Sequence, residues 1–146
     1  MKGYKWSASK ASHTFYAITG IYKPDGTKTT IAMHRLLLDL KKGESCDHIN
    51  HDGLDNRRCN IRKVSNQQNG MNRLKNKGCS CMFKGVCYYK QTKKWKAQIM
   101  IDGNPTHLGY FNTSLEGAFA YDKKAKELFG DYAYLNFPDY NFNQNL

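Results

Sequence analysis

Alternating apolar and polar positions predict strands in both halves of the chain. Residues 14–33 hold two such stretches, TFYAITGIY and TKTTIAM, on either side of KPDG. Pro24 presets the first turn angle and Asp25-Gly26 tolerates positive φ, so we expect a hairpin there. Three further stretches, FKGVCYYKQ, WKAQIMID and THLGYFN, lie between residues 83 and 112 and are separated by short polar turns. They predict a three-stranded antiparallel sheet.

Helix signals follow each group of strands. Ser65 stands three residues before Gln68, which is the spacing of a capping box, so a helix is expected from there to about Leu74. TSLE, which starts at Thr113, repeats this spacing, and Gly130 suits the C-terminal cap of the helix that it opens. That helix has one apolar side. Its residues are Leu115, Ala118, Phe119, Ala125, Leu128 and Phe129.

The chain length and these two groups of elements indicate two lobes. A chain of 146 residues is enough for one ordinary domain or two very small ones. We expect an α+β protein, because strands and helices are segregated rather than alternating. The expected divisions are an N-terminal lobe over 1–76, a linker over 77–82, a sheet packed on one helix over 83–138, and a tail over 139–146.

Basic residues are concentrated in the middle of the chain, whose formal net charge is +11. From Arg57 to Ile101 there are twelve Lys or Arg and no Asp or Glu. A solvated basic face is one explanation for such a run. However, Tyr88, Tyr89 and Trp95 lie among these charges, and that combination favours a phosphate backbone as the partner.

Other partners and compartments are disfavoured by the sequence. No apolar run approaches the ~20 residues of a membrane helix, and we find no amphipathic helix with a basic face, so no membrane contact is expected. The N-terminus, MKGYKWSASK, lacks the apolar core of a secretion signal, which predicts a cytoplasmic protein with reduced cysteines. The five cysteines lack paired CxxC spacing, which argues against structural zinc. They are Cys46, Cys59, Cys79, Cys81 and Cys87.

An Asp-His pair precedes a segment rich in asparagine. Asp47 offers the hard oxygen that Mg²⁺ or Mn²⁺ prefers, and a neutral His48 suits the role of general base. The asparagines then have two open roles, as uncharged metal ligands or as partners that fix the imidazole tautomer. Taken alone, the segment is explained equally simply as an asparagine-rich turn without chemistry.

The order of hairpin, Asp-His, asparagine-rich loop and capped helix resembles the HNH motif, the ββα-metal nuclease site of phage and intron homing endonucleases. MHRLLLD, DHIN, LDNRRCNIR and NQQN carry the resemblance, over about residues 14–76. It implies that His48 is the general base, that Asn60 orients it, and that Asp47 and Asn69 hold one Mg²⁺ or Mn²⁺ ion. Many family members have histidine at the position of Asn69, and an amide oxygen there favours these ions over zinc.

Three other residues of this region have open or minor roles. Arg57 and Arg58 either clamp a phosphate near the scissile bond or are solvated loop residues. His34 resembles the HR pair of the family, so we expect a structural or backbone-contacting role for it.

From Phe83 to Phe137 the chain resembles the DNA-binding domain of plant ethylene-response factors. The resemblance rests on KGV, WKAQI, HLGYF, the AFAYDKKAKELFG helix and LNF, and it implies that the exposed face of the sheet lies in the DNA major groove. Gln98 is then the group suited to a bidentate contact with adenine. The plant domains use several arginines on this face, whereas this chain has lysine, tyrosine and methionine. Phosphate contacts are expected from Lys84, Lys90, Lys94 and Lys96.

Two aromatic positions of this lobe stay open. Either Tyr88 or Tyr89 is expected to be in the core. Trp95 shares the inward parity of Ala97 but could lie at the sheet edge.

Together these features predict a small HNH-type DNA endonuclease from a phage or mobile element. It would cut phosphodiester bonds with one metal ion while its C-terminal sheet holds double-stranded DNA. A single site per chain favours nicking by a monomer or weak dimer, without a protein partner. A DNA-binding regulator without nuclease activity and an RNA-binding protein are the alternatives.

Overall fold

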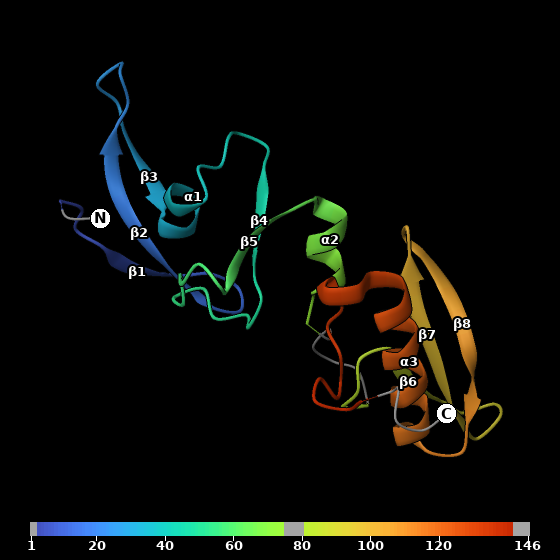
Figure 1. Cartoon of the computed structure of the whole chain (residues 1–146). Coiled ribbons are helices and arrows are strands. Elements are labelled where there is room, and N and C mark those ends of the chain that lie inside the picture. The colour runs from blue at the N-terminus through green and yellow to red at the C-terminus, as the bar shows by residue number, and fades with distance from the viewer. Residues whose placement is uncertain (1–2, 75–80, 142–146) are drawn as a thin grey trace. The chain divides into compact units, whose positions relative to one another are not determined.

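A computed structural model describes residues 3–74 and 81–141 of the chain (Figure 1). The chain forms two compact units, Met1–Asn69 and Gly70–Leu146. The parts of the expected linker and tail at residues 77–80 and 142–146 lie outside the described residues. The described residues form an α+β structure with antiparallel sheets in both units.

A three-stranded antiparallel sheet opens the first unit. Strand β2 (Phe15–Tyr22) pairs on one side with β1 (Ser7–Lys10) and on the other with β3 (Lys28–Ala32). The turn between β2 and β3 confirms the predicted hairpin: the side chain of Asp25 accepts a hydrogen bond from the Thr27 backbone N–H at 2.8 Å.

A second, two-stranded sheet follows a short helix, α1 (Met33–Leu37). Strand β4 (Ser45–His48) pairs with β5 (Ile61–Val64), and helix α2 (Asn66–Met71) comes directly after β5. The α2 helix ends three residues before the predicted Leu74. Gly70, which disfavours a helix by about 1 kcal/mol relative to alanine, stands just before its last residue.

The capping box at the start of α2 is confirmed. The backbone N–H of Ser65 donates to Gln68 Oε1 at 2.8 Å, and the Gln68 N–H donates to Ser65 Oγ at 3.1 Å. Each side chain thus satisfies a backbone donor of the other residue, which fixes where the helix begins.

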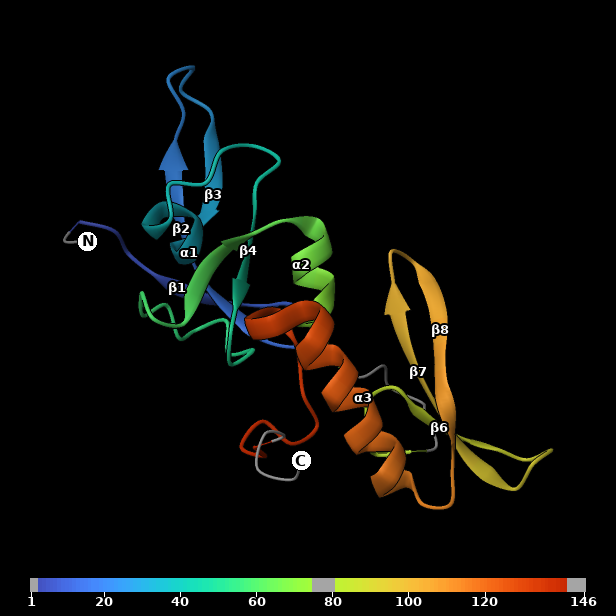
Figure 2. The same ribbon diagram turned by 45° about the vertical axis from the view of Figure 1, so that its right-hand side comes forward.

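The second unit is a three-stranded antiparallel sheet with one long helix packed across it (Figure 2). The helix, α3 (Ser114–Phe129), is opened by the predicted cap: Thr113 Oγ1 accepts a hydrogen bond from the Glu116 N–H at 3.2 Å. A short 3-10 helix, η1 (Gly130–Tyr132), follows it. The strands of this sheet are β6 (Val86–Tyr89), β7 (Lys94–Ile101) and β8 (Asn104–Phe111).

Alternation along β7 decides which side of the sheet is covered by α3. Ala97 and Ile99 are almost completely buried in clusters that include Ala118 and Ala125 of the helix. Trp95 packs against the same core, which answers the question left open by its parity. The intervening Lys96, Gln98 and Met100 therefore face away from the helix. Tyr88, opposite Trp95 in the register, has the inward parity but is 43% exposed, and Tyr89 has the outward parity. The expectation that one of the two lies in the core is therefore wrong, because neither belongs to the buried clusters.

A buried carboxylate joins three segments of the second unit. Asp122 of α3 is 0% exposed; its Oδ1 accepts the Asn136 N–H at 2.9 Å and its Oδ2 accepts the Phe137 N–H at 2.8 Å. Asn136 Oδ1 in turn accepts the Lys84 N–H at 2.7 Å. These bonds satisfy backbone groups that would otherwise be buried without partners. They also bring together KGV, the α3 helix and LNF, the motifs that carry the resemblance of this lobe.

Candidate functional site

The Asp-His pair lies at the end of β4, and its two side chains have different surroundings. Adjacent residues of a strand point to opposite sides. The His48 ring lies against Tyr16 and His34, with centroid distances of 5.7 Å and 5.1 Å. The Asp47 carboxylate meets Arg62, its partner across the β4–β5 ladder. Asp47 and His48 are both 7% exposed, so the pair is sheltered rather than solvated.

Asn56 lies beside the imidazole of His48. Its Oδ1 is 3.4 Å from His48 Nε2, while its Nδ2 donates to the Leu54 carbonyl at 3.0 Å and the Gly53 carbonyl at 3.4 Å. Because an amide oxygen only accepts, this orientation assigns the proton to Nε2 and leaves Nδ1 as the basic nitrogen of the neutral ring. Sequence reasoning missed Asn56, whose only signal is its place in the asparagine-rich segment.

Asn60 holds the chain that follows His48. Its Oδ1 accepts the Asn50 N–H at 3.0 Å, and its Nδ2 donates to Asn50 Oδ1 at 2.8 Å and to the Asp55 carbonyl at 2.8 Å. Its own carbonyl accepts the Ile49 N–H at 2.9 Å. These contacts act on His48 through the main chain, since residues 49 and 50 directly follow it.

Arg62 forms an ion pair with the expected metal ligand. Its Nη2 is 3.0 Å from Asp47 Oδ2, and its Nε also donates to that oxygen at 3.3 Å. The side chain of Arg62 is 19% exposed, so the pair is largely shielded from water. A guanidinium held this way offers a positive charge beside Asp47. The pairing depends on the strand register, which the sequence pattern did not reveal.

Asn69 lines a hollow of about 360 Å³ in the first unit, together with Tyr16 and His34. Both of these rings also contact the ring of His48. The Nδ1 atom of His34 is buried and makes no hydrogen bond to the part of the chain that is described. Burial, followed by the nearby His48 and Arg35, lowers the pKa of His34 to about 4. His34 is therefore a neutral group at the wall of this hollow.

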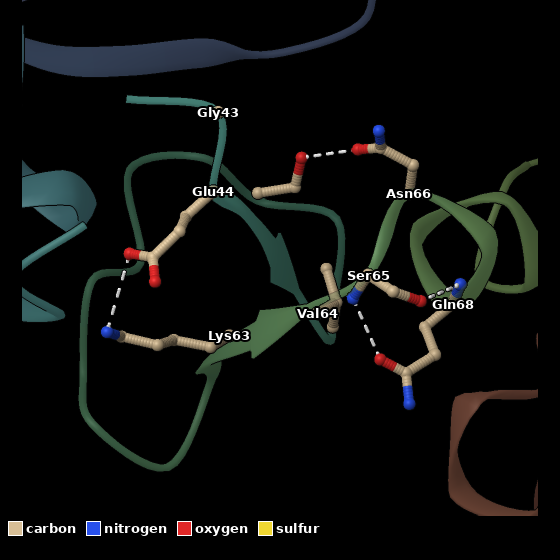
Figure 3. Close-up of a pocket in the computed structure, with 8 residues that line it drawn as sticks. Gly43, Glu44, Lys63, Val64, Ser65, Asn66 and Gln68 are labelled. Atoms are coloured by element: carbon tan, nitrogen blue, oxygen red, sulfur yellow. Dashed lines mark hydrogen bonds and ion pairs between the residues drawn. The ribbon is translucent and has the colours of Figure 1, made fainter. Parts of the chain in front are cut away.

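A second, open hollow is lined by residues at the beginning of β4, at the end of β5 and at the beginning of α2 (Figure 3). Ser45 Oγ donates to Asn66 Oδ1 at 2.7 Å, which ties the first residue of α2 to the first residue of β4. Lys63 and Glu44 form an ion pair at 3.6 Å across the same region. These contacts fix the start of the short helix that carries Asn69.

The expected donors suit a hard cation in their chemistry. Asp47 and Asn69 offer oxygen atoms, which Mg²⁺ and Mn²⁺ prefer over nitrogen and sulfur. Among residues 3–74 and 81–141, no group of three or more His, Cys, Asp or Glu is arranged to hold a metal ion. The described cysteines are free thiols, and Cys79 lies outside the described residues. The four are Cys46, Cys59, Cys81 and Cys87.

The two arginines of the loop before β5 are exposed and differ in their contacts. Arg57 Nη2 lies 2.7 Å from Asp55 Oδ2 and its Nε donates to Asp55 Oδ1 at 2.8 Å, a two-point contact. These hydrogen bonds lower the pKa of Asp55 to about 2. A phosphate would have to compete with Asp55 for Arg57, whereas Arg58 is exposed in the adjacent position.

The outward face of the second unit presents most of the residues expected to contact a polyanion. Lys90 and Lys94 are exposed, and Lys96 and Gln98 are half-buried on that face. Lys84 lies elsewhere. Its ammonium donates to the Met71 carbonyl at 3.0 Å and lies 5.2 Å from the centre of the Tyr134 ring.

Burial lowers the pKa of Lys84 to about 8. Its ammonium is thus engaged inside the unit, which is a poor position for a phosphate contact.

None of the described helices has the length and apolar character needed to cross a bilayer.

Comparisons with known proteins find partial similarity to two kinds of protein. The chain is 44% identical over 62 residues to dehydration-responsive element-binding protein 2D of Arabidopsis thaliana, covering 41% of this chain and 30% of that protein. It is 33% identical over 67 residues to the AP2-like ethylene-responsive transcription factor TOE2 of the same plant, covering 46% and 14%. No family model and no solved structure matches the chain.

A viral protein is similar over a longer stretch. The chain is 33% identical over 94 residues to a protein named uncharacterized HNH endonuclease L560 of Acanthamoeba polyphaga mimivirus, covering 64% of this chain and 48% of that protein. The chain spans less than half the length of each of these three relatives. It is therefore similar, over part of its length, both to plant proteins named for element binding or transcription and to a viral protein named an uncharacterized HNH endonuclease.

Proposed function

We propose that the chain is an HNH-type DNA endonuclease that hydrolyses phosphodiester bonds with one Mg²⁺ or Mn²⁺ ion. The observation that carries the proposal is the sheltered Asp47-His48 pair at the end of β4, in which Asn56 leaves the imidazole Nδ1 as the basic atom. The similarity to a viral protein named an HNH endonuclease supports the same reading.

His48 acts as the general base in this proposal. Its Nδ1 takes a proton from the water that attacks phosphorus, and Asn56 and the neutral His34 keep the ring oriented. Asp47 and Asn69 would hold the metal ion. When bound, that ion stabilises negative charge at the phosphoryl centre and on the departing 3′ oxygen.

The outcome of the reaction follows from having one such site per chain. A single site cuts one strand in each binding event, so the expected product from supercoiled plasmid is a nicked circle. By resemblance to HNH nucleases, the ends would carry 5′-phosphate and 3′-hydroxyl groups. Cutting of both strands would need a weak dimer or two successive binding events.

The second unit is proposed to hold the duplex through the outward face of its sheet. Lys90, Lys94 and Lys96 supply positive charge for phosphates, and Gln98 supplies the donor and acceptor pair that matches adenine. Two plant relatives are named for element binding and for transcription, which supports DNA as the polyanion.

A plasmid assay tests the nuclease proposal. Wild-type protein with Mg²⁺ or Mn²⁺ should nick supercoiled DNA, while His48→Ala and Asp47→Ala should slow nicking by about 100-fold or more, because a general base alone contributes about 10²–10⁴-fold. Both variants should still retard DNA on a gel. His13→Ala changes an exposed histidine of the same unit and should cut normally.

A DNA-binding regulator without nuclease activity is the second candidate. The Arg62–Asp47 ion pair favours it, because the guanidinium occupies the carboxylate that the metal would need. This alternative predicts retardation of DNA without nicking in either metal ion. Undiminished cutting by His48→Ala would instead remove that residue from the proposed mechanism.

A further inference from the structure

The outward face of the second sheet carries apolar and aromatic side chains in a defined order. In the β7–β8 register, Lys96 lies opposite Tyr110, Gln98 opposite His107, and Met100 opposite Pro105. Residues that are directly opposite in an antiparallel pair share a face of the sheet. The His107 and Tyr110 rings are 4.7 Å apart, which agrees with this arrangement.

Two large apolar groups of this face are open to solvent. Met100 is 53% exposed and Tyr110 is 43% exposed, although the opposite face of the same strands is packed against α3. The Tyr89 ring lies 5.6 Å from that of Tyr110 and extends the aromatic surface onto β6. Within the described residues, the side-chain amide of Gln98 makes no hydrogen bond.

The charge around this surface points to a polyanion. Strands β6, β7 and β8 contain no acidic residue, while Lys94 and Lys96 lie on β7 and Lys90 on the turn before it. Lys94 and Lys96 lie toward one end of the central strand and Met100 lies toward the other, so this face offers both positive charge for phosphates and apolar groups for base edges.

The residue types on this face discriminate between base pairs. The sequence has no arginine after Arg73, so the two-pronged Arg contact to guanine, the commonest specific contact in the major groove, is absent from this face. A glutamine amide matches the N6 and N7 edge of adenine, and apolar side chains match the 5-methyl group of thymine. Gln98, Met100 and Tyr110 together thus fit A·T pairs better than G·C pairs.

We propose that the outward face of β6–β8 reads A·T pairs in the major groove, with Gln98 on adenine and Met100 and Tyr110 on the thymine 5-methyl group. This inference rests on the proposed function, in which the same face holds duplex DNA. It adds the class of target sequence and the residues that select it.

Removal of the methyl group alone gives a direct test. The full chain is titrated, in EDTA to prevent cutting, against fluorescent duplexes of equal length and mixed A/T sequence that contain either thymine or deoxyuridine. Deoxyuridine should weaken binding about 5-fold, and a G·C duplex should bind about 10-fold more weakly, within the range for loss of one or two base contacts. A duplex of G·5-methylcytosine pairs presents a methyl group in the major groove but no adenine. It therefore separates the contribution of the methyl group from that of the Gln98 contact with adenine.

Variants assign the effect to named side chains. Met100→Ala should reduce the difference in affinity between the thymine and deoxyuridine duplexes, with Tyr110 retaining part of it, and Gln98→Ala should reduce the preference for A·T over G·C. Met82→Ala is the matched control, because Met82 is 80% exposed in the same unit but lies outside the sheet and should leave both ratios unchanged. Unaltered thermal unfolding shows that each variant is folded.

The results separate this inference from the nuclease proposal. Equal affinity of the wild type for thymine and deoxyuridine duplexes, or tighter binding of G·C, would overturn the A·T assignment. Nicking of plasmid by the wild type, and its loss in His48→Ala, tests the nuclease site without reference to base preference.

Discussion

The environment of His48 is set by side chains that the Asp-His motif does not contain. Asn56 faces Nε2 at 3.4 Å, and the rings of Tyr16 and His34 pack on the imidazole. A general base works only if its basic atom is turned toward the reacting water. At the scale of residues, therefore, the proposed chemistry depends on orientation as much as on residue type.

Replacement of Asn56 should reveal this orientation. Asn56→Ala removes the acceptor at Nε2 and should slow nicking about 10-fold or more, as loss of such supporting contacts does at metal sites. Asn56→Asp retains an acceptor but places a negative charge beside the ring, which stabilises the imidazolium and should move the acid limb of the pH–rate profile to higher pH. Unchanged profiles for both variants would contradict the role of Asn56.

His34 should make the stability of the first unit depend on pH. Its pKa is lowered from 6.5 to about 4 in the folded protein, chiefly by burial. Between these values the unfolded chain binds more protons, so stability should fall as pH is lowered through this window, by at most about 1.4 kcal/mol per pH unit. Urea unfolding at several pH values, followed by Trp6 fluorescence in a chain that carries Trp95→Phe, measures the slope.

Two variants check that His34 is the cause. His34→Gln removes the titrating group and should flatten the dependence of the unfolding free energy on pH between about pH 4 and 6.5. His13→Gln, at an exposed position, should retain the wild-type slope. The same slope in all three proteins would show that another group is responsible.

At the scale of elements, the close approach of β6 and α3 depends on one glycine. Gly85 has φ +78°, and a Cβ added there would lie 2.0 Å from Cδ2 of the Tyr121 ring. Gly103 has a similar φ of +81°, but an added Cβ would meet nothing within 4 Å. A comparison of Gly85 with Gly103 therefore separates the cost of a left-handed backbone from the cost of steric overlap with the Tyr121 ring.

Alanine substitution at both glycines tests this distinction. Gly103→Ala should cost about 1–2 kcal/mol of stability, from the left-handed backbone alone. Gly85→Ala should cost clearly more, because the Tyr121 ring must also move out of a packed core. Urea unfolding followed by Trp95 fluorescence, in a chain that carries Trp6→Phe, compares the two variants. Equal losses of stability would mean that the Tyr121 ring moves aside at no cost in free energy.

Local patterns predicted the elements better than the contacts between them. The hairpin around Asp25, the capping box at Ser65, the N-cap at Thr113 and the inward parity of Ala97 follow from short-range spacing, and the structure confirms them. Strand β1 was missed because SASK lacks apolar alternation and pairs with β2 through its backbone. The contact of Arg62 with Asp47 could not be read from the sequence, since it requires the β4–β5 register.

For the whole molecule, basic charge and the two resemblances indicate the class of partner, while the roles of individual residues still depend on local burial. Lys84 shows the difference: it belongs to the basic run in the sequence, yet its ammonium lies over the Tyr134 ring inside the second unit. The predicted roles of Asp47, Asn60 and Asn69 stay predictions until the plasmid and variant assays are done.

The carboxylate of Asp122 sets a lower limit on how far the second unit can be shortened. A chain cut after Phe129 would retain every strand and the long helix, but it would lose the two backbone N–H groups, of Asn136 and Phe137, that solvate this charge. A buried carboxylate without donors would then have to take up a proton or pull water into the apolar interior. The smallest autonomously folding fragment of this half should therefore extend at least to Phe137.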